Sequence, residues 1–227
     1  MPIHLTFDDG PGPLTGALLD VLKSHDVRAT FFVIGKSVEE ARWQGGTPAA
    51  CKAMLADAIR DGHEIGNHTY SHKLDQTEVE FAGDVNRCDA VIAALYEAAG
   101  QPGARVPRIR LPYGVQLPGT PMMYRNLFRT WSVMLDPRIN LLASLGRAHF
   151  HWTEESEDWR PEATTQSIVK RLVQHITKME QIGLNSVVVL HDRNEFHMQR
   201  EGPRTLNAVK EFLVFAKTQN WKFLDPV

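Results

Sequence analysis

The sequence has few cysteines and almost no net charge, and both features limit the class of protein that it can encode. Two cysteines, Cys51 and Cys88, in 227 residues exclude a disulfide-rich scaffold and a cysteine-based zinc motif. Both lie in segments predicted to be helical, so we expect two buried reduced thiols, with a single disulfide as the alternative. A net charge of −2 and a pI near 6.5 favour neither nucleic acid nor an anionic membrane as a partner.

Long apolar runs are also missing from the chain. No stretch approaches the roughly 20 apolar residues of a membrane-spanning helix. The N-terminus lacks the basic head, the apolar stretch and the small-residue cleavage site of a signal peptide. We expect a cytoplasmic protein if the chain is complete and a secreted or periplasmic one if a leader has been removed. The oligomeric state stays open.

Short β-branched segments alternate with helical patterns along the chain. Strands are predicted at Ile3–Phe7, Thr30–Ile34, His63–Gly66, Arg108–Leu111, Ala148–Trp152, Ser186–Leu190 and Trp221–Leu224. Helices are predicted at Thr15–His25, Ala49–Arg60, Thr77–Ala99, around Ile168–Ile176 and at Leu206–Ala216. This alternation predicts an α/β fold with a parallel sheet covered by helices. About seven units suggest a barrel, or a barrel missing one unit, as a single domain over residues 1–227.

Polar residues follow the predicted strands at the same end. Asp8–Asp9 ends the first strand, and His191–Asp192 ends the apolar run SVVVL. His68, His72 and the pair Asp158–Trp159 follow other strands. Active sites of parallel α/β folds lie at the carboxyl ends of the strands, so we expect these side chains to share one site.

The spacing of His68 and His72 predicts a metal site. Four residues apart, two imidazoles lie on one face of a helical turn, although chance can also produce this spacing among ten histidines. A carboxylate from Asp8–Asp9 would complete the two-imidazole, one-carboxylate set of a catalytic zinc site. Consecutive side chains of an extended segment diverge, so one aspartate can bind the metal while its neighbour acts as a general base.

Five motifs in order, TFDDGP, HTYSH, RLPYG, EDW and LHD, resemble those of the polysaccharide deacetylases, also called the NodB homology domain or carbohydrate esterase family four. The segments ATFFVIGK and GHEIGNHTYSH are similar to that family as well, and the resemblance spans about residues 3–225. It implies a distorted (β/α)7 barrel that removes acetyl groups from N-acetylated sugars. It also implies a divalent metal, zinc, with cobalt or nickel as alternatives.

The resemblance implies a role for each motif residue. Asp8 is the catalytic base, Arg110 orients it and keeps it ionised, and Asp158 pairs with the general acid His191; Asp9, His68 and His72 hold the metal; the backbone N–H of Tyr113 stabilises the oxyanion; Trp159 and Leu190 line the pocket for the acetyl methyl group. Two alternatives stay open. Arg108 could take the role of Arg110, and Asp136 that of Asp158.

Two long connections, Val115–Arg147 and Arg193–Gly202, lie near the predicted site. We expect them to shape substrate access and to favour short substrates, with surface decoration as the alternative. Two alternatives to this function stay open. One is deacetylation of O-acetyl esters or small non-sugar amides and imides, and the other is carbohydrate binding without catalysis. The complete set of Asp8, Asp9, His68, His72 and His191 argues against the last of these.

Overall fold

One parallel sheet organises the residues that the computed structural model describes, which are 2–41, 43, 46–103, 107–113, 137–192 and 203–226. Its strands are β1 (Pro2–Gly10), β2 (Thr30–Val33), β3 (Glu64–Asn67), β4 (Glu154–Glu155), β5 (Ser186–His191) and β6 (Lys222–Phe223). The helices are α1 (Thr15–Ser24), α2 (Gly35–Glu40), α3 (Pro48–Arg60), α4 (Glu78–Ala98), α5 (Pro137–Ser144), α6 (Thr165–Gln181) and α7 (Arg204–Thr218). The expected alternation of strands and helices is confirmed.

The sheet closes on itself through two isolated bridges. Its hydrogen-bonded order is β3-β2-β1-β5-β4, and β6 pairs with the first residues of β1. Beyond β3, Asn67 bridges in parallel to Ile109, and Ile109 bridges to His149. The chain after His149 becomes β4, which pairs with β5 and so completes the ring. This is the distorted (β/α)7 barrel that the family resemblance implied.

Some elements differ from the sequence-based expectation. Only Ile109 of the expected strand Arg108–Leu111 pairs with its neighbours. The expected strand Ala148–Trp152 is reduced to a bridge at His149, and regular pairing begins only at Glu154. Helices α2 and α5 are too short to show a periodic apolar pattern and were not predicted.

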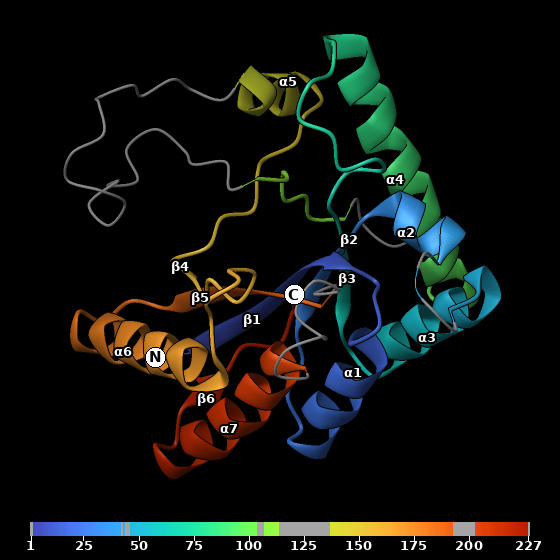
Figure 1. Cartoon of the computed structure of the whole chain (residues 1–227). Coiled ribbons are helices and arrows are strands. Elements are labelled where there is room, and N and C mark those ends of the chain that lie inside the picture. The colour runs from blue at the N-terminus through green and yellow to red at the C-terminus, as the bar shows by residue number, and fades with distance from the viewer. Residues whose placement is uncertain are drawn as a thin grey trace.

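The side chains of strand β1 alternate between an apolar layer under the helices and the barrel interior. Side chains alternate between the two faces of a strand. Ile3, Leu5 and Phe7 are fully buried in a cluster that also holds apolar residues of α1, α3, α6 and α7, the helices ranged around the sheet in Figure 1. His4, Thr6 and Asp8 alternate with them and are buried as well. Their hydrogen-bond partners lie on β2, on β5 and at Arg110, so the barrel interior is polar.

A second apolar cluster covers the side of the barrel where Ile109 lies. Phe81 and Val85 of α4 and Leu142 of α5 pack there against Ile109 and Leu111. Cys51 and Cys88 are buried and free, so the disulfide alternative is wrong. Burial raises the pKa of the Cys51 thiol to about 12, in keeping with an inert core thiol.

Candidate active site

Asp8 lies near the carboxyl end of β1 and forms a buried ion pair with Arg110. The Arg110 Nη1 donates to Asp8 Oδ1 at 2.7 Å and to Thr6 Oγ1 at 2.7 Å. Its Nε donates to the backbone carbonyl of Phe150 at 3.1 Å, and its guanidinium lies 4.3 Å from the centre of the Phe32 ring. Arg110 is fully buried, and burial lowers its pKa while Asp8 opposes the shift. One guanidinium thus fixes the position of the Asp8 carboxylate.

Asp9 faces a different set of partners. Its Oδ1 lies 3.2 Å from His68 Nε2 and 3.0 Å from His72 Nε2. Burial raises the pKa of Asp9, but the hydrogen bonds from the two imidazoles outweigh burial and hold it well below its ordinary value. The adjacent carboxylates of Asp8 and Asp9 therefore diverge, as the sequence suggested.

Asp9, His68 and His72 form a donor set suited to a divalent metal. One ligand atom from each lies within 4.8 Å of the others. The Nδ1 of His68 is 2.8 Å from the backbone carbonyl of Arg110. With a metal bound, a proton on Nδ1 would satisfy that carbonyl and leave the Nε2 lone pair for the metal, the usual arrangement of a metal-bound imidazole. Two imidazoles and one carboxylate fit zinc with an open position for a substrate.

The histidines converge because of left-handed backbone, and the expected helical turn is wrong. Residues 68–72 contain no helix. Thr69 and His72 have φ values of 64° and 55°, and Asp9 and Tyr113 have 73° and 68°. Non-glycine residues in this region are uncommon and store strain, which clusters at functional sites. Two of these four residues, Asp9 and His72, are ligand side chains, and Thr69 directly follows the third ligand, His68.

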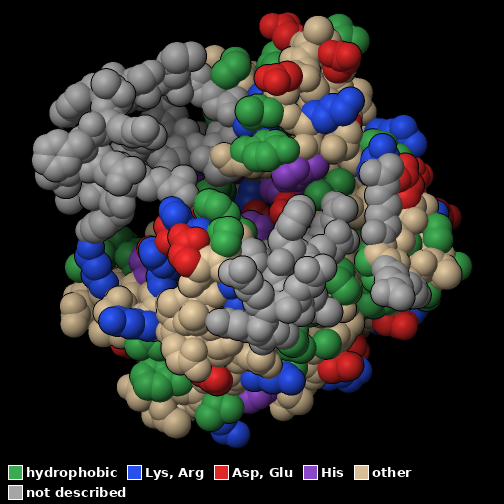
Figure 2. Space-filling model, in the orientation of Figure 1, with side chains coloured by type: hydrophobic (Ala, Val, Ile, Leu, Met, Phe, Trp, Pro, Cys, Tyr) green, Lys and Arg blue, Asp and Glu red, His purple; other side chains and the backbone are tan. Residues whose placement is uncertain are grey.

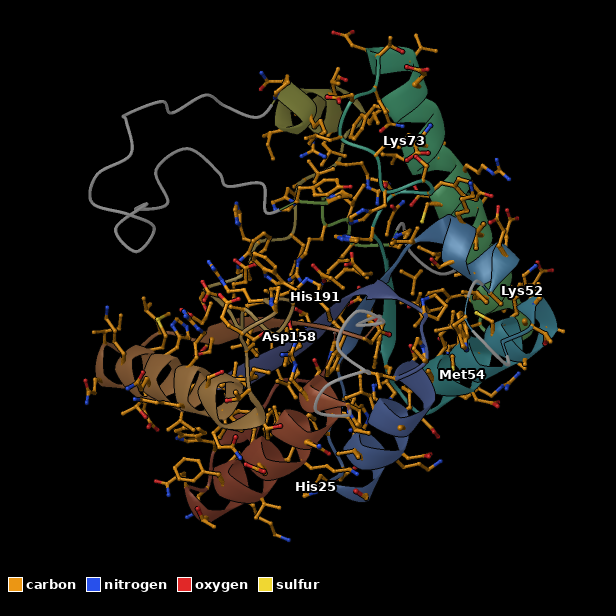
Figure 3. The ribbon with its side chains drawn as sticks, viewed as in Figure 1. His25, Lys52, Met54, Lys73, Asp158 and His191 are labelled. Atoms are coloured by element: carbon orange, nitrogen blue, oxygen red, sulfur yellow. The ribbon has the colours of Figure 1, made fainter. Side chains whose placement is uncertain are left out.

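His191 and Asp158 form a second ion pair beside the first. Figure 3 shows the two side chains together near the centre of the molecule, and His191 Nδ1 lies 2.7 Å from Asp158 Oδ1. Asp158 Oδ2 accepts from the His191 backbone N–H at 2.9 Å and from Thr205 Oγ1 at 2.8 Å. Burial lowers the pKa of His191, but the Asp158 carboxylate opposes burial, and the pKa rises to about 10. Because His191 pairs in register with Asp8, the imidazolium lies next to the first carboxylate.

Tyr113 and Trp159 are exposed residues at the rim. The Tyr113 ring centre is 4.6 Å from that of His72, and its hydroxyl donates to the His72 carbonyl at 3.1 Å. Trp159 Nε1 donates to Glu155 Oε1 at 2.6 Å, so Glu155 fixes the indole. Figure 2 shows histidine and acidic side chains gathered in a recess of this face.

Leu190 does not line the site, contrary to expectation. It is fully buried in the cluster between sheet and helices and pairs in register with Phe7, whose side chain is in the same cluster. Its neighbour Val189 pairs with Thr6 and shares a face of β5 with His191. Val189 is thus the apolar residue next to His191 on the face of β5 that points into the barrel.

The sequence reading also missed the role of Asp192. This buried residue accepts a hydrogen bond from Thr15 Oγ1 at 2.6 Å, and its backbone N–H donates to the Asp8 carbonyl at 3.3 Å. A Cβ at Gly10 would lie 2.3 Å from Asp192 Oδ2, so only glycine fits there. Burial raises the pKa of Asp192 to about 7. Asp192 therefore fixes the turn that follows Asp9.

Of the two candidate arginines, Arg110 contacts Asp8, whereas Arg108 pairs with Glu64. Asp136, all of Arg193–Gly202 and residues 114–136 of the Val115–Arg147 connection lie outside the described residues. The structure therefore gives no geometry for the Asp136 alternative or for substrate access past these connections.

The family model for polysaccharide deacetylase matches residues 1–126, which carry Asp8, Asp9, His68, His72 and Arg110. The chain belongs to the polysaccharide deacetylase family. It is 32% identical over 194 residues to a chitooligosaccharide deacetylase of Sinorhizobium fredii, covering 84% of this chain and 71% of that protein. It is 28% identical over 233 residues to a peptidoglycan-N-acetylglucosamine deacetylase of Bacillus cereus, covering 97% and 67% of the two chains.

A solved relative shows that the whole deacetylase fold is shared. The catalytic domain of peptidoglycan N-acetylglucosamine deacetylase from Eubacterium rectale aligns with a TM-score of 0.70 and 27% identity. The alignment covers 99% of this deacetylase chain and 88% of that domain. Within the described ranges, no helix combines the length and apolar character needed to cross a bilayer.

Proposed function

We propose that the protein is a metal-dependent deacetylase that hydrolyses the acetamido group of N-acetylated sugars, releasing acetate and a free amine. The observation that carries the proposal is the division of labour between two consecutive carboxylates. Asp8 contacts Arg110, whereas Asp9 contacts His68 and His72. Such a pair supplies a general base and a metal ligand within one short segment.

Asp9, His68 and His72 would hold the metal, with zinc as the first candidate and cobalt or nickel as alternatives. A metal there supplies Lewis-acid polarisation of the acetyl carbonyl and lowers the pKa of water. His68 is held for this role by the Arg110 carbonyl, and Arg110 in turn holds Asp8. A single residue therefore links the ligand set to the base.

Asp8 would accept the proton of the attacking water, and His191 would donate a proton to the nitrogen that leaves. Their opposite charges suit these roles. Asp158 keeps His191 protonated at neutral pH, since the pKa of this imidazole is about 10. Asp8 and His191 pair in register on neighbouring strands, which supports a base and an acid that act on one substrate carbon.

The backbone N–H of Tyr113 would donate to the oxygen of the acetyl carbonyl as negative charge develops on it. The left-handed conformation of Tyr113 turns the chain at the rim, where its side chain packs on His72. Trp159 would contact the acetyl methyl group, and Val189 would take the role expected for Leu190, because it shares a face of β5 with His191.

The test is a panel of acetylated substrates incubated with the metal-loaded protein. Acetate and new primary amine should appear in equal amounts from N-acetylglucosamine oligomers and not in the matched Asp8→Asn protein. Release of acetate from acetylated xylan without release from any N-acetylated sugar would replace the proposal with an esterase. No acetate from any substrate would favour a binding domain.

A further inference from the structure

The loop that carries both histidines, Asn67–His72, rests on helix α4. The carboxylate of Asp84 accepts the Ser71 N–H at 3.1 Å, and the Arg87 guanidinium lies 3.6 Å from the centre of the Tyr70 ring. Lys73, which directly follows the loop, also lies beside α4 in Figure 3. Side chains of one helix therefore contact successive residues of the loop between the two histidines.

Asn67 makes the central contact between the loop and α4. This fully buried residue donates through Nδ2 to the Val85 carbonyl at 3.0 Å and to Asp89 Oδ1 at 2.6 Å. The two acceptors fix which way the amide points. Its Oδ1 must then face the loop, where it accepts the Thr69 N–H at 2.7 Å.

Thr69 passes this constraint to a predicted metal ligand. Its φ of 64° is a left-handed conformation that a β-branched residue adopts only when its surroundings impose it. The hydrogen bond from Thr69 N–H to Asn67 supplies such a constraint. The Thr69 Oγ1 then accepts the backbone N–H of His72 at 3.1 Å, and His72 is itself left-handed. A continuous series of hydrogen bonds thus runs from Asp89 on α4 to His72.

We propose that Asp89 is a positioning residue for the metal site and acts on His72 through Asn67 and Thr69. The inference rests on the metal site proposed above but not on the identity of the substrate. Asp89 contacts no predicted ligand directly. Its effect comes from orienting the Asn67 amide, without which the loop loses the acceptor that holds Thr69 in its strained conformation.

A second contact of Asp89 provides a matched control. Its Oδ2 forms an ion pair with Arg147 at 2.6 Å, and Arg147 also donates to the Pro107 carbonyl. Arg147→Ala breaks the ion pair but leaves Asp89 Oδ1 free to hold Asn67. Asp89→Ala removes both contacts. Asp89→Asn loses the ion pair but keeps an oxygen that can accept from Asn67.

The experiment titrates the metal-free full chain and these variants with Co²⁺ and then Zn²⁺, following the Co²⁺ absorption bands, and records urea unfolding of each metal-free protein. Asp89→Ala should weaken metal binding roughly 10-fold or more, the usual effect of removing an outer partner of a ligand. Asp89→Asn and Arg147→Ala should stay near the wild-type dissociation constant. The unfolding midpoint of Asp89→Ala should fall at least as far as that of Arg147→Ala, because Asp89→Ala removes both contacts.

Two results would overturn the inference. Asp89→Ala could bind both metals as tightly as wild type, or Arg147→Ala could weaken binding as much as Asp89→Ala, which would assign the effect to the ion pair. A wild-type protein that bound neither metal would instead overturn the metal site itself. Metal binding without deacetylation would leave the inference standing while the proposed function failed.

Discussion

The two ends of the barrel interior each contain an arginine–carboxylate pair, but only the pair at the carboxyl end is buried. At the carboxyl end Arg110 contacts Asp8 at 2.7 Å, and at the amino end Arg108 contacts Glu64 at 3.1 Å. The two arginines are two residues apart in one extended segment, so both side chains face the barrel interior. Either could have served the site on sequence grounds.

The polar groups of the amino end bind one another. His4 Nε2 lies 2.9 Å from Thr30 Oγ1, and this hydroxyl donates to Glu64 at 2.9 Å. Burial, with Arg108 and Arg110 nearby, lowers the pKa of His4 to about 4, so the ring is neutral at neutral pH. This network stabilises the barrel. Its polar groups bind one another and do not converge on a position that a metal could occupy.

The carboxyl end differs from the amino end in two ways: its backbone contains left-handed residues, and its ligand atoms converge. Asp9, Thr69, His72 and Tyr113 are left-handed there, and three ligand atoms approach the same point. Among the residues described, the amino-end partners His4, Thr30, Glu64 and Arg108 are all right-handed or extended. Buried polarity alone therefore does not mark a functional site, whereas strained backbone together with converging ligand atoms does.

The largest effect should come from Asp8. Asp8→Asn should lower kcat/KM for deacetylation by roughly 10²–10⁴, because a positioned general base is lost. Its metal content should stay at the wild-type level, whereas Asp9→Asn should lose metal. Elemental analysis with acetate release separates the two variants. Glu64→Gln, at the amino end, is the matched control and should keep its turnover; near-full turnover of Asp8→Asn would reverse the assigned roles.

The two arginines provide the next comparison. Arg110→Met leaves the buried Asp8 carboxylate without its guanidinium partner and should lower the free energy of unfolding by about 3–5 kcal/mol. Arg108 is partly exposed, so Arg108→Met should cost about 1 kcal/mol or less. Urea unfolding of the metal-free proteins measures both values. Equal losses would mean that the two ends of the barrel do not differ as described.

The pH profile tests the pair of His191 and Asp158. Because the pKa of His191 is raised, the protonated acid and the stability of the pair persist above the ordinary histidine range and are lost as pH rises toward about 10. Asp158→Asn should move the alkaline limb of kcat/KM down, with metal content unchanged. Thr205→Val, which removes another hydrogen bond to Asp158, should shift it less. An alkaline limb that stays in place would exclude His191 as the acid.

The smallest effect should appear at the amino end. The pKa of His4 is lowered, so the unfolded chain binds a proton that the folded chain does not, and stability falls as pH drops below the ordinary histidine pKa toward about 4. His4→Gln should remove about 2 kcal/mol of the stability loss between about pH 6.5 and about pH 5. Unfolding at both pH values measures it. Deacetylation by His4→Gln should be unchanged. A loss of activity would mean that the network at the amino end also supports the site at the carboxyl end.

The sequence allows the strands with long apolar patterns to be predicted, and it allows the motif residues to be assigned to one end of the sheet. It does not reveal the left-handed conformation at Thr69, which a β-branched side chain disfavours, or at His72, because the enrichment of histidine in this region does not single out one histidine among ten. A helical turn was therefore expected where a hydrogen-bonded loop stands. Leu190 was placed on the wrong face by one residue, since the strand SVVVL is apolar on both faces. Bridges at Ile109 and His149 depend on barrel closure, which local patterns do not encode.

The central claim is that the carboxyl end is a metal-dependent deacetylase site. It is tested most directly by acetate release from an N-acetylglucosamine oligomer, measured on the native protein, after removal of metal by a chelator, and after addition of Zn²⁺. We predict that chelation abolishes release while the far-ultraviolet circular dichroism spectrum is retained, and that Zn²⁺ restores release in wild type but not in Asp8→Asn. Release that continues at its full rate in the chelated, folded protein would contradict the claim.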